Sequence, residues 1–112
     1  METTLSMLSE DVRWQVQGAP NVPTVGILQG KEQVKAWMLN FPKHFKPLTF
    51  ELDRYFESGN EVIVTGRFRH LVLSTQREVG SDLSIHFIVK NGLIHSYRIL
   101  EDSYALYLAF NP

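Results

Sequence analysis

The chain contains no cysteine, which excludes several kinds of chemistry at once. Without cysteine there is no disulfide framework, no thiolate nucleophile and no thiolate metal site. A protein that needs no disulfides suits a reducing compartment, so the composition predicts a cytoplasmic location. The sequence has no basic flank followed by an apolar signal segment, and no apolar run approaches the roughly 20 residues that cross a bilayer. Secretion and membrane insertion are therefore not expected.

A strong charge of either sign is also absent. Eleven basic and twelve acidic side chains leave a formal net charge of -1. Lys and Arg form no patch that would attract a phosphate backbone, so nucleic acid is not an expected partner. The four histidines do not have the spacing that metal ligands use within one element. The sequence thus predicts neither a metal site nor another cofactor.

What the chain does contain suits one folded domain. Its 112 residues are 44% hydrophobic and 21% charged, which is typical of globular proteins and unlike the composition of disordered chains. This length is sufficient to bury a core but too short for two domains. We therefore expect a single domain over residues 1–112.

The first third of the chain predicts a short helix, a strand and a loop. Residues 4–10 suit about two helical turns, and residues 12–17 alternate between apolar and polar side chains, as a half-buried strand does. Residues 18–30 hold three Gly and two Pro among polar turn formers. They predict a long loop that forms part of a pocket rim.

The clearest helix is predicted over residues 31–41. Its apolar side chains fall at positions i, i+3, i+4 and i+7, which places them on one face of a helix. Pro42 ends the predicted helix, because proline does not continue one. The residues of this apolar stripe are Val34, Trp37, Met38 and Phe41.

Beyond residue 47 the apolar period changes to two, which predicts strands joined by tight turns. Gly66, inside one of these strands, predicts a bulge or a bend. Asn91-Gly92 lies between two β-rich segments and predicts a hairpin with a type I′ turn. The apolar tail after residue 102 is compatible with either a short helix or an irregular end. The first predicted strand begins at Leu48, and Arg54 is the exception to its alternation. Four apolar residues of this strand are expected on one face: Leu48, Phe50, Leu52 and Phe56.

Together these elements predict an α+β fold. We expect a cone-shaped roll in which a curved antiparallel sheet, mixed at most, wraps about five strands around the amphipathic helix.

Four segments, in this order and spacing, resemble one known family: MLSEDVRW, GILQGKEQVKAWM, LTFELDRYFESGNEVIVTGRF and IHFIVKNGLIHSYRILEDSYAL. The chain is similar to the SnoaL-like branch of the superfamily that includes nuclear transport factor 2 and ketosteroid isomerase, over Leu8 to Leu108. That resemblance implies the cone-shaped fold with an apolar pocket, but the scaffold hosts isomerases, cyclases, dehydratases, hydrolases and noncatalytic binders.

Two departures from the family pattern limit the reactions it implies. Relatives usually begin with a long helix that covers the cone, and only about seven residues precede SEDVRW here, so this helix looks absent or much shortened. By resemblance, the isomerases' general-base aspartate falls on Val16 and their second carboxylic acid on Ile85. Steroid-type isomerisation by that pair of carboxyl groups is therefore not expected.

The resemblance places His95, Tyr97, Ile99 and Glu101 on the concave face. A Glu101 carboxyl in an apolar pocket would have a raised pKa, which suits a general acid or base. The alternative is a solvated Glu101 at the rim of the sheet. Asp102 is expected to cap the following turn rather than to react.

His70 completes the candidate catalytic set of Glu101, Tyr97 and His70. It has the apolar parity of its strand, so it is predicted to point into the pocket as a base or hydrogen-bond donor. A bulge at Gly66 would turn it outwards, and a structural role is the other alternative.

The pocket itself is expected to be lined by large apolar side chains, although aromatic residues at strand or helix period also form ordinary cores. The predicted ligand-binding residues are Trp14, Val16, Trp37, Phe50, Phe68, Ile85 and Phe87.

The resemblance also implies a homodimer formed through the convex face of the sheet. We expect a small hydrophobic molecule as the ligand, and two classes of function stay open. The chain is either a ligand-binding protein of unproven activity or an acid/base enzyme acting on a small carbonyl or polyketide-like compound. The aliphatic residues expected on the convex face, too many to be left exposed to solvent, are Ile63, Leu71, Ile88, Ile94 and Leu100.

Overall fold

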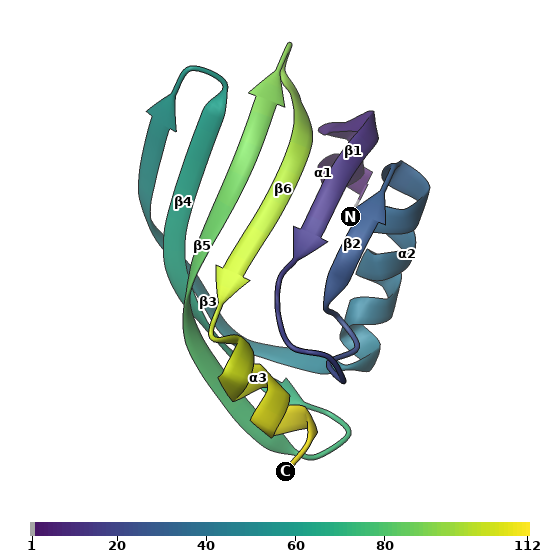
Figure 1. The fold of residues 1–112 in the computed structure, drawn as a ribbon, viewed down its shortest axis with the longest axis vertical. Helices are drawn as coiled ribbons and strands as arrows, with labels where there is room; N and C mark the ends of the chain where they lie inside the picture. The colour runs from purple at the N-terminus through teal and green to yellow at the C-terminus, as the bar shows by residue number, and fades with distance from the viewer. Residues whose placement is uncertain (1) are drawn as a thin grey trace.

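The computed structural model describes residues 2–112 and shows a strongly curved six-stranded sheet with helix α2 at one side and α3 at its lower end (Figure 1). The α+β fold predicted from the sequence is confirmed. The strands are β1 (Leu8–Val16), β2 (Gly26–Gln29), β3 (Phe45–Ser58), β4 (Glu61–Val72), β5 (Arg77–Lys90) and β6 (Leu93–Glu101). The helices are α1 (Glu2–Ser6), α2 (Lys31–Asn40), the 3₁₀ turn η1 (Phe41–Lys43) and α3 (Ser103–Phe110).

The strand order is β2-β1-β6-β5-β4-β3, so the first and last strands of the chain meet in the middle of the sheet. All neighbours are antiparallel except β1 and β6, which run parallel, and the sheet is therefore mixed. The long strands β3, β4 and β5 bend along their length, so that the sheet has a concave face (Figure 1). Within residues 2–112, no helix is long and apolar enough to cross a membrane.

The predicted hairpin between β5 and β6 is confirmed. Asn91 and Gly92 have φ values of 53° and 75°, and a type I′ turn requires positive φ at both central positions. Asparagine and glycine tolerate this left-handed conformation better than other residues do. The turn sets the register of β5 and β6, and β6 carries two of the candidate site residues, Tyr97 and Glu101.

The N-terminal prediction is wrong in its boundaries. The expected helix over residues 4–10 is only α1, five residues long, and β1 already begins at Leu8. Leu8 pairs with Ile94 on β6 and is almost fully buried, so long-range pairing overrides the local helical pattern. The short α1 agrees with the expectation of a curtailed first helix.

The segment expected to be a loop contains the sixth strand, which is why the sheet has one strand more than predicted. Residues 26–29 form β2 and pair antiparallel with β1, Arg13 lying opposite Gln29. Four residues rich in turn formers give little periodic signal, so the strand is defined by its partner β1 rather than by its own sequence.

Helix α2 matches the prediction to within one residue. It ends at Asn40, and Pro42 lies in the 3₁₀ turn that follows. The helix packs against β1 and β2, and Val34 of its apolar stripe is fully buried. The remaining stripe residues, Trp37, Met38 and Phe41, line the cavity described below.

Two bulges reverse the expected side-chain alternation. In β3 the register shifts between Leu52 and Arg54, so Phe56 pairs with Ile63 on the convex face and does not share a face with Phe50, contrary to prediction. In the β5–β6 ladder the register shifts next to His95. As a result Ile94, expected on the convex face, packs against the buried core.

The undecided tail forms helix α3. The Ala105 amide donates to the Asp102 carboxylate at 3.0 Å, which confirms Asp102 as the N-cap. Leu106 and Ala109 are buried, and the Thr75 hydroxyl donates to the Ala109 carbonyl at 2.6 Å. These contacts hold α3 across the lower end of the sheet (Figure 1).

Candidate functional site

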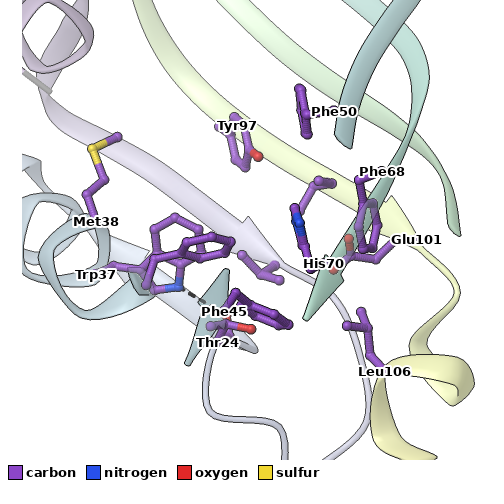
Figure 2. Close-up of a pocket in the computed structure, with 13 residues that line it drawn as sticks. Thr24, Trp37, Met38, Phe45, Phe50, Phe68, His70, Tyr97, Glu101 and Leu106 are labelled. Atoms are coloured by element: carbon purple, nitrogen blue, oxygen red, sulfur yellow. Dashed lines mark hydrogen bonds between the residues drawn. The ribbon is translucent and has the colours of Figure 1, made fainter. Parts of the chain in front are cut away.

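A cavity of about 260 Å³ lies between α2, the concave face of the sheet and α3. Its wall is mostly apolar, as is usual for small-molecule sites, with a few polar side chains directed into it (Figure 2). The residues that line it are Val16, Thr24, Trp37, Met38, Phe41, Phe45, Phe50, Phe68, His70, Tyr97, Ile99, Glu101 and Leu106.

Glu101 supplies the carboxyl group of this cavity. It is the last residue of β6, opposite Leu83 of β5, and the hydrogen bond from the Asp102 amide to Ser81 Oγ, 2.8 Å long, holds the strand end. Burial raises the pKa of the Glu101 carboxyl from 4.5 to about 7. Near neutral pH this group is therefore both a proton donor and a proton acceptor, as general acid/base chemistry requires.

Tyr97 lies four residues before Glu101 on the same face of β6 and lines the same cavity (Figure 2). Its ring stacks on Trp14 of β1 with 3.6 Å between centroids and 8° between planes, and Phe87 packs against its other side edge-on at 5.6 Å. Burial, and then the negative charge of Glu101, raise the pKa of the Tyr97 phenol. The phenol thus stays protonated and available as a hydrogen-bond donor.

His70 is 8% exposed and points into the cavity from β4. The bulge lies opposite Gly66 on β3, so it does not turn His70 outwards. The ring stacks on Phe68 at 4.4 Å and contacts Phe41 and Phe45. Burial lowers the pKa of His70 below its ordinary value of 6.5, and a hydrogen bond to the Arg69 carbonyl opposes this effect.

The three candidate catalytic residues thus face one cavity. No hydrogen bond between any two of them is present among residues 2–112. They form three separate polar positions around a mainly apolar space (Figure 2). Their roles in binding or catalysis stay predictions.

Of the seven predicted ligand-binding residues, four line the cavity: Val16, Trp37, Phe50 and Phe68. The other three lie outside the lining. Trp14 and Phe87 hold Tyr97 between them, and Ile85 is buried in the core beside Ile99. Strand parity predicts which face of the sheet a side chain occupies. It does not predict which part of the concave face the cavity covers, so these three residues were wrongly expected in its lining.

Several lining residues were not predicted as ligand contacts. Met38 and Phe41 belong to the helical stripe, whose spacing could have indicated them. Phe45 begins β3 in a segment without periodicity, and Leu106 lies on α3, whose position follows from tertiary packing. Thr24 lies in the loop expected to form a pocket rim, and its carbonyl accepts a 3.0 Å hydrogen bond from the Trp37 indole.

Comparisons with known proteins agree with this architecture. The SnoaL-like domain family matches residues 1–97. The chain therefore belongs to the SnoaL-like family. A search of curated proteins gives no match.

Solved structures of the same shape are numerous. An NTF2-like protein from Burkholderia xenovorans LB400 is 25% identical, with a TM-score of 0.88 over 96% of this chain and 80% of the other. An NTF2-like protein of unknown function from Burkholderia pseudomallei K96243 is 20% identical, with a TM-score of 0.84 over 96% and 82%. TerC co-crystallized with polyporic acid is 18% identical, with a TM-score of 0.85 over 99% and 85%. The last two show the fold alone.

Proposed function

We propose that this protein binds a small hydrophobic molecule in the cavity between α2 and the sheet. The observation that supports this most is the cavity itself, whose wall is largely aromatic and aliphatic and carries Glu101, Tyr97 and His70. An apolar space with a few polar groups directed into it is typical of small-molecule sites. That TerC, a protein of the same fold, was co-crystallized with polyporic acid adds support.

Calorimetric titration with 1-methoxynaphthalene tests this proposal, because the compound is small, apolar and uncharged. Met38 lines the cavity, whereas its neighbour Leu39 is 54% exposed and does not line it. Met38→Trp fills part of the cavity and is expected to weaken binding about tenfold or more. Leu39→Trp is the matched control and should bind like the wild type. Equal binding by both variants, or failure of the wild type to bind either this compound or 1-naphthol, would contradict the proposal.

A second candidate function is acid/base catalysis, and the raised pKa of Glu101 beside Tyr97 supports it. Such an enzyme would remove a proton next to a carbonyl group of its substrate, with Glu101 as base and Tyr97 as hydrogen-bond donor to the oxyanion. Deuterium incorporation next to the carbonyl of 1-tetralone in D₂O measures this step by NMR. The wild type is expected to accelerate incorporation, and Glu101→Gln to abolish the acceleration while the affinity stays nearly unchanged. Acceleration that survives in Glu101→Gln would exclude Glu101 as the base.

The homodimer through the convex face also remains a proposal. That face carries the half-buried aliphatic residues Ile63, Ile88 and Leu100 together with Phe56, which is exposed. We expect sedimentation to give the mass of two chains at micromolar concentration, and Ile63→Arg to reduce it to one chain. A wild-type mass of one chain would contradict this expectation.

The cytoplasmic location and the lack of a nucleic-acid partner stay proposals as well. They rest on the absence of cysteine and on the balanced charge of the sequence.

A further inference from the structure

The orientation of the His70 ring determines which hydrogen-bonding group it offers to the cavity. His70 Nδ1 lies 3.1 Å from the backbone carbonyl oxygen of Arg69. A carbonyl oxygen only accepts hydrogen bonds, so Nδ1 carries the hydrogen and donates it. In the neutral ring, Nε2 then carries a lone pair and no hydrogen.

The surroundings of His70 favour this neutral ring. Three phenylalanines, Phe41, Phe45 and Phe68, pack around it, and burial holds the pKa of His70 below its ordinary value. An imidazolium would lose its hydration in this environment, and in the described part of the chain, residues 2–112, His70 makes no ion pair with a carboxylate. The aromatic contacts also restrict the ring plane. His70 lines the cavity, and within residues 2–112 its Nε2 makes no hydrogen bond, so Nε2 is free to accept one from a ligand.

The other nitrogen group in the wall cannot substitute for His70. The Trp37 indole N–H is already bound to the Thr24 carbonyl at 3.0 Å (Figure 2), and an indole nitrogen offers no acceptor. Of these two nitrogen groups, His70 Nε2 is therefore the one that can accept a hydrogen bond from a ligand. It lies on the side of the cavity opposite α2 (Figure 2).

We infer that the cavity takes a small apolar molecule bearing a hydroxyl group, and that His70 Nε2 accepts the hydrogen of that hydroxyl. The inference rests on the proposed ligand-binding function and narrows its ligand class. A carbonyl or ether oxygen at this position would face a second lone pair and gain no hydrogen bond. An ammonium group would donate, but it would be desolvated among phenylalanine rings at a large cost. A neutral hydroxyl group donates a hydrogen bond to Nε2 and carries no charge that would lose its hydration.

A pair of probes that differ only in the hydroxyl hydrogen tests the inference at pH 7.5. Calorimetry compares 1-naphthol with 1-methoxynaphthalene, which has the same rings and oxygen but no donor. The wild type is expected to bind 1-naphthol up to about tenfold more tightly, the effect of one buried hydrogen bond. His70→Phe keeps an aromatic ring among its neighbours and should remove this preference. His70→Gln, which still offers an acceptor oxygen, should restore part of it.

Glu101 is the competing acceptor, so Glu101→Met is the necessary control and should keep the preference for 1-naphthol. A preference that disappears in Glu101→Met but survives in His70→Phe would assign the hydroxyl to Glu101 and overturn the inference. Equal wild-type affinity for both probes would overturn it while leaving the ligand-binding function intact. Failure of both probes to bind would remove the function and the inference together.

A direct measurement on the wild type does not depend on any variant folding. Long-range ¹H–¹⁵N NMR spectra distinguish a protonated from an unprotonated ring nitrogen. We expect Nδ1 to be protonated, Nε2 to be unprotonated, and the Nε2 resonance to shift when 1-naphthol is added but not when 1-methoxynaphthalene is added. A hydrogen on Nε2 in the free protein would contradict the proposed acceptor.

Discussion

Glu101→Gln should make the protein more stable at pH 8 and leave its stability unchanged at pH 4.5. Folding raises the pKa of this carboxyl from 4.5 to about 7, because burial disfavours the charged form. Between these two pH values the folded state holds the proton more tightly than the unfolded state does. The free energy of unfolding of the wild type therefore falls as pH rises through this window.

The shift corresponds to about 3 kcal/mol of lost stability above pH 7, at roughly 1.4 kcal/mol per pKa unit. A glutamine side chain has no charge to bury, so the variant avoids this loss. Urea denaturation at pH 4.5 and pH 8, followed by tryptophan fluorescence, measures the difference. Asp102→Asn is the matched control, since it removes the next carboxylate along the chain from an exposed position and keeps a capping side chain. A Glu101→Gln gain that is equal at both pH values would show that Glu101 is solvated.

This stability cost has a functional meaning. A carboxyl kept in an apolar cavity destabilises the fold at neutral pH, and residues that serve a reaction or a ligand commonly carry such a cost. The cost alone does not distinguish binding from catalysis. The deuterium incorporation experiment makes that distinction.

Much of the fold could be predicted from the sequence because its elements have strong local signals. The stripe of α2 and the Asn91-Gly92 turn lie where the patterns placed them. The strand β2 and the start of β1 were missed, because both are defined by pairing partners far along the chain. Local propensity carries no information about such partners.

The site was predictable only where strands are regular. Parity placed Phe68 and His70 on the concave face of β4, whose pairing with β5 is uninterrupted. The resemblance placed Tyr97 and Glu101 on that of β6, in the part of the strand that follows its bulge. Parity failed for Phe56, which lies beyond a bulge, because one extra residue reverses the faces of all that follow. It also could not indicate which part of a long concave face the helices α2 and α3 close into a cavity.

The second large effect on stability is expected at the bulge of β3, which lies opposite Gly66 of β4. Gly66→Ala is expected to destabilise the protein by on the order of 4 kcal/mol or to prevent folding, which is at the upper end for single substitutions. A Cβ atom at Gly66 would lie 1.9 Å from the Glu51 carbonyl oxygen and 2.9 Å from the Leu52 Cα. Both contacts are with backbone atoms, so no side-chain rotation relieves them.

This close approach is what allows β3 to bend over β4. Asp53 is the extra residue of the bulge, which bends the strand, and Phe50 of the same strand lines the cavity. Gly80→Ala is the matched control in the neighbouring strand, because its Cβ would lie 3.4 Å from its nearest neighbour, the Phe68 carbonyl oxygen. We expect Gly80→Ala to fold with stability close to that of the wild type in thermal and urea denaturation. If Gly66→Ala matched Gly80→Ala in both measurements, the contact between β3 and β4 at the bulge would not be close, and the bend that shapes the cavity would need another cause.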